Sequence, residues 1–190
     1  MTDLSIPDTE RRQRVLDAAL AVFARYGFRK TSMDEVARAA DISRQGLYFL
    51  FGGKEELFRE ALTKMMRDGL AAVEAELVGD APIDQRLIAA MTAWYGRTDG
   101  SRAETADELF ARSVDLLGDM MERYGEAVLS RLTDAIASSP LAAGLAPRGL
   151  TPADAALTLD YCGQGLKHGK LSRADFAARL TAAVRLVTGA

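Results

Sequence analysis

The segment from Ser43 to Phe51, SRQGLYFLF, constrains the fold of this 190-residue chain more than any other. A serine is a favoured helix N-cap, and the glycine pair that follows Phe51 ends a helix, so the pattern predicts a short helix over Arg44–Leu50. A helix of this length is not stable by itself in water. We therefore expect Leu47 and Phe51 to be buried against neighbouring helices, which leaves the first turn of the segment facing outward.

Two further helices are predicted before this segment. The first opens near Asp8 or Thr9 and ends around Gly27, a position that favours a residue able to adopt a positive φ. The second begins at Ser32, because Glu35 three residues later completes a capping-box pattern. A long helix followed by two short helices that are joined by a tight turn is a helix-turn-helix arrangement.

The rest of the chain also follows the helical period, and no alternating strand pattern is visible. Helices are predicted at residues 54–77, 83–95, 102–113, 116–138, 152–168 and 172–187, with a proline- and glycine-rich loop before the last two. The sequence thus predicts an all-α chain in two parts. Residues 1–54 form a three-helix N-terminal domain, and residues 55–190 form a helical C-terminal domain.

Composition points to a soluble globular protein. Hydrophobic residues make up 48% and charged residues 27% of the chain, and no apolar run is long enough for a membrane span. The N-terminal segment lacks the apolar stretch of a secretory signal, and a single cysteine fits a reducing compartment, so we expect a cytoplasmic protein. The net charge is −3, but residues 1–67 carry 12 Lys and Arg against 10 Asp and Glu, and are the more basic part.

Catalytic and metal-binding chemistry find little support in the residues. Cys162 and His168 are the only cysteine and histidine, which falls short of a normal metal site. No nucleophile and base can be paired from their spacing. We therefore expect no enzyme activity, no cofactor and no metal.

The first turn of the predicted 44–50 helix carries the residue types that read base edges. An arginine can donate two hydrogen bonds to guanine and a glutamine can pair with adenine, so Arg44 and Gln45 are expected to contact bases in the major groove. Gly46 would let the backbone approach the groove closely. Residues at or near helix starts are expected to contact phosphates, namely Thr31, Ser32, Ser43, Tyr48 and Lys54.

Three arginines near the start of the chain have two interpretations of equal weight. Arg11, Arg12 and Arg14 could reach the DNA backbone or minor groove as a basic arm, or they could lie on a solvated helix face.

The residues from Ala18 to Leu62 resemble the DNA-binding domain of the TetR family of bacterial regulators. The resemblance rests on an ordered set, F…YGF, TS, VARAADIS, LY…F and KEELF. It implies a dimer that binds a partly palindromic operator, usually as a repressor, with Tyr48 and Lys54 on phosphates. This sequence departs from the family at Leu50, where tyrosine or histidine is frequent, and the apolar Phe49 is expected to contact thymine methyl groups.

The same resemblance implies that residues 55–190 bind a small-molecule effector, which releases the DNA, and hold the dimer together. An apolar or aromatic effector is expected in a pocket formed by Met91, Trp94, Tyr95, Phe110, Met120, Met121 and Tyr124, although each could equally fill a core. Glu108, Arg112 and Asp115 are considered as polar anchors. Dimerisation is expected through the last two helices, from Leu157, Tyr161, Phe176, Leu180 and Val184.

Three other functions remain open at this point. The chain could be an activator or architectural DNA binder that needs no ligand, which predicts no cavity in the C-terminal part. It could be a helical enzyme or carrier that retains the N-terminal module, which predicts a titratable cluster in an internal pocket. A protein-interaction module would instead lack duplex binding and expose an apolar groove.

Overall fold

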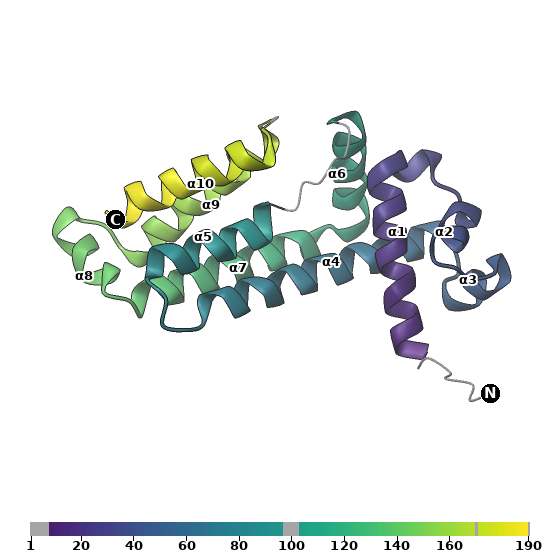
Figure 1. Cartoon of the computed structure of the whole chain (residues 1–190), viewed down its shortest axis with the longest axis horizontal. Helices are drawn as coiled ribbons and strands as arrows, with labels where there is room; N and C mark the ends of the chain where they lie inside the picture. The colour runs from purple at the N-terminus through teal and green to yellow at the C-terminus, as the bar shows by residue number, and fades with distance from the viewer. Residues whose placement is uncertain (1–7, 97–102, 170, 190) are drawn as a thin grey trace. The chain divides into compact units, whose positions relative to one another are not determined.

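A computed structural model describes residues 8–96, 103–169 and 171–189, and every regular element in these ranges is helical (Figure 1). The elements are α1 (Asp8–Lys30), α2 (Met33–Ala39), α3 (Arg44–Leu50), α4 (Lys54–Leu77), α5 (Ile83–Tyr95), α6 (Ala103–Leu117), α7 (Asp119–Ala137), α8 (Leu141–Leu145), the 3₁₀ turn η1 (Ala146–Arg148), α9 (Pro152–His168) and α10 (Arg173–Thr188). The predicted all-α fold is confirmed. Within the described ranges, none of the helices is both long enough and apolar enough to cross a membrane.

Helix ends in the N-terminal part follow the local signals of the sequence. The Ser32 hydroxyl accepts a hydrogen bond from the Glu35 N–H at 3.2 Å, and the Glu35 carboxylate accepts one from the Ser32 N–H at 2.8 Å. This capping box starts α2 as predicted. Gly27 has φ 83° and ψ 164°, so it interrupts the helical path of α1 near its end, as its position predicts.

Two boundaries in the C-terminal part differ from the prediction. The segment predicted as a loop contains the short helix α8 and the turn η1. The chain between α6 and α7 turns at one residue, Gly118, whose φ of 42° lies in the left-handed region. Because a single glycine makes this turn, α6 extends to Leu117 and α7 begins at Asp119.

The described chain packs as two compact units. Among the described residues, unit 1 combines residues 8–66 with residues 103–121, and unit 2 combines residues 67–96 with residues 122–169 and 171–189. The helix α4 contributes its first half to unit 1 and its second half to unit 2. The expected domain boundary at residue 54 falls inside unit 1, because α6 and the first half of α4 pack with α1. A functional division at residue 54 stays a prediction.

Aromatic rings form the centre of unit 1. The centroid of Phe58 on α4 lies 4.8 Å from that of Phe23 and 5.1 Å from that of Phe28, both on α1. Leu47 and Phe51 are also buried, at 0% and 1% exposure. Their burial anchors the short helix α3 on the larger helices, as the sequence predicts.

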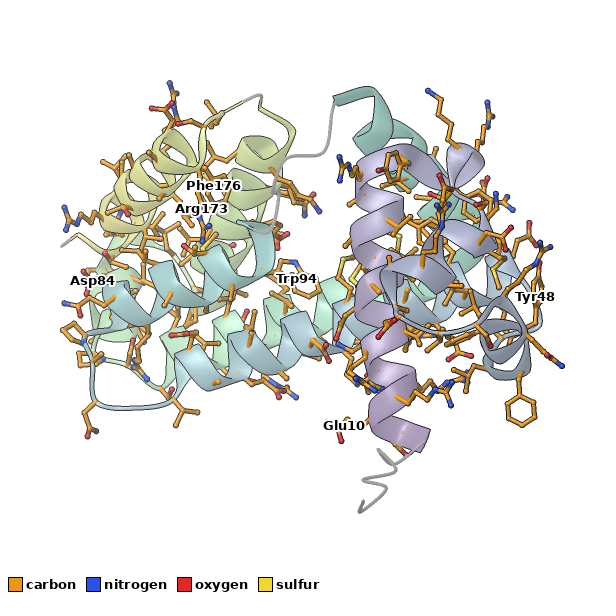
Figure 2. The ribbon with its side chains drawn as sticks, turned by 45° about the vertical axis from the view of Figure 1, so that its right-hand side comes forward. Glu10, Tyr48, Asp84, Trp94, Arg173 and Phe176 are labelled. Atoms are coloured by element: carbon orange, nitrogen blue, oxygen red, sulfur yellow. The ribbon has the colours of Figure 1, made fainter. Side chains whose placement is uncertain are left out.

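The core of unit 2 is mainly aliphatic and draws on α4, α5, α7, α8, α9 and α10. Its fully buried residues include one or more from each of α4, α5, α7, α9 and α10, namely Val73, Leu87, Leu132, Ile136, Leu159, Leu180 and Val184. Figure 2 shows the side chains that fill this core. These contacts define which faces of α9 and α10 are left at the surface.

Candidate nucleic-acid interface

The outward face of α3 carries the residues expected to meet DNA. The Ser43 hydroxyl accepts a hydrogen bond from the Gly46 N–H at 3.0 Å and so caps the helix. Because Leu47 faces inward, Arg44 and Gln45 are exposed in the first turn. Phe49, also on this face, is 88% exposed.

Arg44 is held by two neighbours on the surface. Its Nη1 lies 3.1 Å from the Asp34 carboxylate on α2, and its guanidinium carbon lies 5.6 Å from the centroid of the Tyr48 ring. The side chains of Arg44 and Asp34 are 63% and 51% exposed. An ion pair this exposed contributes little stability, so Arg44 can exchange Asp34 for another acceptor. Tyr48 is itself 44% exposed and stands at the surface of α3 (Figure 2).

Gly46 has a local structural reason to lack a side chain. A Cβ built at this position would lie 3.1 Å from the Ser43 hydroxyl oxygen and 3.4 Å from Nη2 of Arg11. A side chain would therefore crowd the cap of α3. This steric reason stands beside the expected approach to bases and does not depend on it.

Two of the residues expected at phosphates are already committed to contacts within the chain. Thr31 is only 2% exposed, and its hydroxyl donates to the Gly27 carbonyl at 2.7 Å, so its side chain is not accessible to a phosphate in this conformation. The Lys54 ammonium donates to the carbonyls of Phe28 and Thr31, each at 3.0 Å, and to that of Arg29 at 3.4 Å. It also lies 4.6 Å from the Phe28 ring centroid. Lys54 thus caps the carbonyl end of α1.

Ser32 and Ser43 remain exposed at the starts of α2 and α3. The Ser32 hydroxyl also donates to the Glu35 carboxylate at 2.9 Å. Hydrogen bonds from the backbone and hydroxyl of Ser32 lower the pKa of Glu35, which keeps this carboxylate charged and in place.

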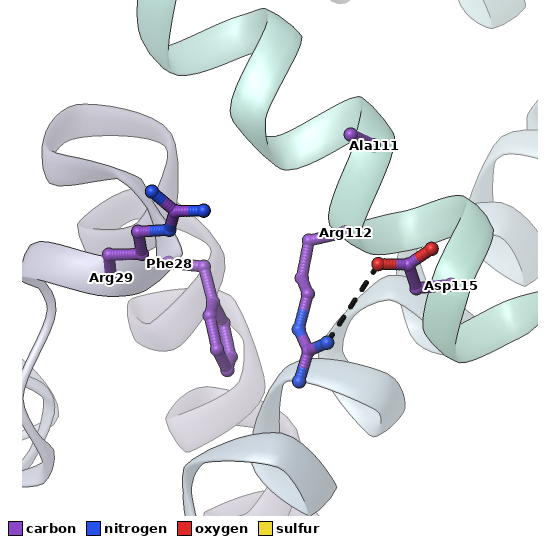
Figure 3. Close-up of a pocket in the computed structure, with 5 residues that line it drawn as sticks. All are labelled: Phe28, Arg29, Ala111, Arg112 and Asp115. Atoms are coloured by element: carbon purple, nitrogen blue, oxygen red, sulfur yellow. Dashed lines mark ion pairs between the residues drawn. The ribbon is translucent and has the colours of Figure 1, made fainter.

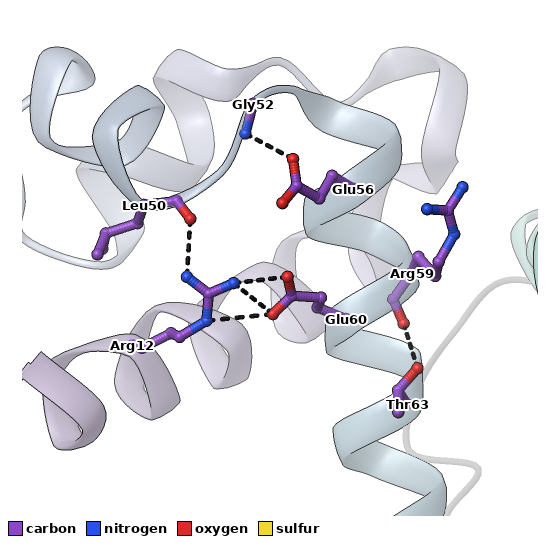
Figure 4. A network of polar contacts seen from close by, with 7 residues as sticks. All are labelled: Arg12, Leu50, Gly52, Glu56, Arg59, Glu60 and Thr63. Atoms are coloured by element: carbon purple, nitrogen blue, oxygen red, sulfur yellow. Dashed lines mark hydrogen bonds and ion pairs between the residues drawn. The ribbon is translucent and has the colours of Figure 1, made fainter.

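Arg12 belongs to a polar network that sequence spacing did not reveal (Figure 4). Its guanidinium donates to both carboxylate oxygens of Glu60 and to the Leu50 carbonyl at 2.7 Å. It also stacks 4.3 Å from the centroid of the Phe51 ring. The partners lie 38 to 48 residues away in the sequence, so no local pattern identifies them.

A cavity of about 480 Å³ opens in unit 1 between the end of α1 and α6 (Figure 3). It is lined by Phe28, Arg29, Ala111, Arg112 and Asp115. Arg112 pairs with Glu55 and lies 3.9 Å from Asp115, and its guanidinium carbon lies 4.9 Å from the Phe28 ring centroid. Of the residues considered as polar anchors, Arg112 and Asp115 therefore share one cavity.

The residues expected to form an effector pocket are divided between two cores. Met91 and Tyr95 are buried in unit 2, with Trp94 packed against the same core. Met120 and Met121 pack against the core of unit 1. Tyr124 is partly buried on α7, and the side chain of Phe110 lies outside the described residues. None of those whose side chains are described lines the cavity between α1 and α6, because periodicity marks a buried face without saying which core it joins.

Unit 2 contains a buried polar group around Asp160 that the sequence patterns did not predict. The Asp160 carboxylate is 7% exposed and accepts hydrogen bonds from the Tyr95 hydroxyl and, at 2.7 Å, from the Gln164 amide. Burial, together with the hydrogen bond to Asp160, raises the pKa of Tyr95 well above its ordinary value. The i, i+4 spacing of Asp160 and Gln164 on α9 was the available signal.

Three of the five residues expected at a dimer interface are not at the surface. Phe176, Leu180 and Val184 are at most 5% exposed, because their stripe on α10 packs into the core of unit 2. The expectation for these three is therefore corrected. Leu157 and Tyr161 on α9 are 37% and 64% exposed, and both remain available to a partner. Leu186 on α10, which was not considered, is 79% exposed.

Within the described residues, no three His, Cys, Asp or Glu side chains gather closely enough to hold a metal ion. Cys162 is partly buried and forms no disulfide.

The helices α2 and α3, with the exposed first turn of α3, form a helix-turn-helix arrangement. Residues 15–61 match the family model described as "Bacterial regulatory proteins, tetR family". This N-terminal segment, which spans α2, α3 and parts of α1 and α4, is therefore similar to that family.

Individual relatives of this chain are named as transcriptional regulators. The HTH-type transcriptional regulator AcrR of Shigella flexneri is 35% identical over 75 residues, which are 40% of this chain and 34% of AcrR. The HTH-type transcriptional regulator SrpR of Pseudomonas putida is 28% identical over 119 residues, which are 62% of this chain and 54% of SrpR. The chain thus matches only about a third to a half of the length of these curated relatives.

Solved structures extend the likeness over nearly the whole chain. A TetR-like transcriptional regulator from Rhodococcus sp. RHA1 superposes with a TM-score of 0.64 at 22% identity, covering 97% of this chain and 100% of the other. At this identity the likeness establishes the fold.

Proposed function

We propose that the chain binds a specific duplex operator through α3 and regulates transcription there as a repressor. The observation that carries the proposal is the division of α3 into two faces. Leu47 is fully buried, while Arg44, Gln45 and Phe49 are exposed side by side. Such a face can enter the major groove, where Arg44 and Gln45 read base edges and Phe49 contacts thymine methyl groups.

Phosphate contacts in this proposal come from residues around α3. The exposed hydroxyls of Ser32, Ser43 and Tyr48 supply them. The backbone of Gly46 approaches the groove beside them. Thr31 and Lys54 take part only if DNA draws them out of the contacts they make in the free chain.

We further propose that the regulator acts as a homodimer on an operator of inverted half-sites. The exposed apolar residues Leu157 and Tyr161 on α9 and Leu186 on α10 support a partner surface on these two helices. A two-fold dimer would present two copies of α3 to half-sites about one duplex turn apart. The cytoplasm is the expected compartment for this activity.

Release by a small-molecule effector is the remaining part of the proposal. Because α4 is one continuous helix shared by both units, a ligand that favours one position of α4 in unit 2 would also move residues of unit 1. A ligand can shift this balance only by its difference in affinity between the two states. The buried Tyr95–Asp160–Gln164 group supports a polar anchor for a ligand in unit 2.

Selection of genomic fragments by the purified dimer tests the DNA-binding proposal. We expect an enriched inverted repeat, and we expect Arg44→Ala to relax the preference at one base pair at a cost of roughly 1–3 kcal/mol. Recovery of no enriched sequence would contradict the proposal.

A second experiment tests release by an effector. A ligand found by thermal shift should weaken operator binding. Tight ligands that leave it unchanged would favour the ligand-independent activator or architectural binder.

A further inference from the structure

Arg12 connects three segments of the DNA-binding unit through a single guanidinium. Its Nη1 donates to the Leu50 carbonyl, the last residue of α3, at 2.7 Å. Its Nε and Nη2 donate to the Glu60 carboxylate on α4 at 3.1 and 2.6 Å. The plane of the group lies over the Phe51 ring, with the guanidinium carbon 4.3 Å from the centroid. Every nitrogen of the group therefore has a partner inside the chain.

The Leu50 carbonyl, which accepts the hydrogen bond from Arg12, is at a helix end and has no N–H donor within the helix. The last four carbonyls of any α-helix lack an N–H from the next turn. In α3 the break after Phe51 removes that turn, so the Leu50 carbonyl needs an outside donor. Arg12 supplies it while it is held by a two-point contact with Glu60, a geometry that a lysine cannot reproduce.

A second contact from α4 holds the same end of α3. The Glu56 carboxylate accepts a hydrogen bond from the Gly52 N–H at 2.7 Å, one turn of α4 before Glu60 (Figure 4). Because α3 has only seven residues, its direction depends on such contacts rather than on its own stability. The end of α3 is thus tied to α4, directly through Glu56 and through Arg12 to Glu60.

We infer that Arg12 is a positioning residue for base recognition and not a DNA contact. By tying the Leu50 carbonyl to Glu60, Arg12 sets the direction in which α3 presents Arg44 and Gln45. The inference rests on the proposed DNA binding of α3, and it decides between the two interpretations that the sequence leaves for Arg12. Discrimination between operator and random duplex should then depend on both Arg12 and Glu60.

The two interpretations of Arg12 predict opposite effects of Glu60→Gln on duplex affinity. If Arg12 contacted a phosphate, Glu60→Gln would free the arginine and remove a negative charge, so duplex binding would tighten. If Arg12 positions α3, Glu60→Gln weakens the clamp and operator binding falls although a negative charge has been removed. The sign of the effect of Glu60→Gln is therefore diagnostic.

The test measures dissociation constants for the selected operator and for a random duplex of equal length at several salt concentrations. The variants are Arg12→Lys, which keeps the charge, and Glu60→Gln, with Arg25→Ala as the control for an exposed charge on the same helix. We expect each of the first two to lower the ratio of operator to random affinity by about tenfold, as for loss of a hydrogen bond to a charged group. The double variant should be no worse than either single variant, because the two residues act as one contact.

The salt dependence separates positioning from phosphate contact. A lost phosphate contact lowers the slope of log affinity against log salt by about 0.9. We expect Arg12→Lys and Arg12→Ala to leave this slope unchanged. An unchanged affinity ratio in Arg12→Lys and Glu60→Gln, or a lower slope in Arg12→Ala with tighter binding in Glu60→Gln, would overturn the inference.

Hydrogen exchange of the DNA-free protein gives a readout that does not depend on the proposed function. We expect Glu60→Gln to speed exchange of the Leu47 and Phe51 amides, which close α3, more than exchange of amides in the middle of α1. Equal protection of α3 in the parent and in Glu60→Gln would contradict the clamp. If the parent protein binds no duplex, the proposed function is contradicted. If the parent binds and Arg12→Lys binds in the same way, only the role of Arg12 is contradicted.

Discussion

The carboxylate of Asp34 lies 3.1 Å from the guanidinium of Arg44, so α2 holds the arginine that we propose reads a base. Both side chains are more than half exposed. Arg44 must leave or share this partner when it reaches a guanine. On the proposed function, Asp34 would therefore compete with DNA for Arg44.

Replacement of Asp34 by asparagine should tighten DNA binding at low salt. The gain should reach at most about fivefold, because an exposed ion pair contributes no more than about 1 kcal/mol, and it should shrink as salt is raised. Fluorescence anisotropy at two salt concentrations measures it. Asp17→Asn makes the same charge change at a residue paired with Lys64 on α4. An equal gain in that control would mean that only net charge matters.

Replacement of Lys54 by methionine should destabilise unit 1 and leave the salt dependence of DNA binding unchanged. The substitution removes hydrogen bonds to three carbonyls at the end of α1, which should cost about 1–3 kcal/mol of unfolding free energy. Urea unfolding measures the loss, with the exposed Lys30→Met as control. Unchanged stability with a lower salt slope would instead mean that Lys54 contacts phosphate, as the family resemblance implies.

Two glycines of α9 should respond in opposite ways to alanine. A Cβ at Gly163 would lie 2.3 Å from Cδ2 of Tyr95, whose ring is tethered through its hydroxyl to Asp160. We expect Gly163→Ala to cost about 1–3 kcal/mol through overpacking. At Gly165 nothing lies within 4 Å, so alanine should be neutral or should stabilise the helix by up to about 1 kcal/mol. Thermal unfolding of both variants checks the contrast, and equal effects would contradict it.

Acid should weaken the start of α2 through Glu35. Hydrogen bonds from Ser32 lower the pKa of Glu35 below its ordinary 4.5 in the folded chain. The charged carboxylate therefore stabilises the fold above about pH 4.5, and this contribution is lost as pH falls through the lowered pKa of the folded state. In the Glu35→Gln variant the unfolding temperature should consequently fall less than in the parent between about pH 5 and pH 3. Parallel curves for the two proteins would argue against it.

Local signals made the N-terminal fold predictable. The Ser32–Glu35 capping box, the Ser43 cap and the positive φ of Gly27 each depend on residues within four positions of one another. Such signals also predicted that Leu47 would be buried and Arg44 exposed, which the structure confirms. The outward face of the candidate site therefore followed from the sequence alone.

Long-range partners could not be predicted in the same way. Lys54 lies at a position that fits a phosphate contact, but its ammonium finds carbonyls of α1 more than 20 residues earlier. Arg12 and Glu60 are separated by 48 residues, so their pairing depends on how α1 crosses α4. The stripe of Phe176 and Leu180 marked an apolar face, but a stripe does not say whether it faces its own core or another subunit, and the expected dimer contact was wrong for these residues.

The exposed ring of Phe49 has a calorimetric consequence. In the free chain Phe49 is 88% exposed, which is high for so large an apolar residue. Docking against thymine methyl groups would strip that water away, and removal of apolar surface from water lowers the heat capacity. Duplexes that carry thymine beneath the ring should therefore give a more temperature-dependent binding enthalpy than duplexes that do not.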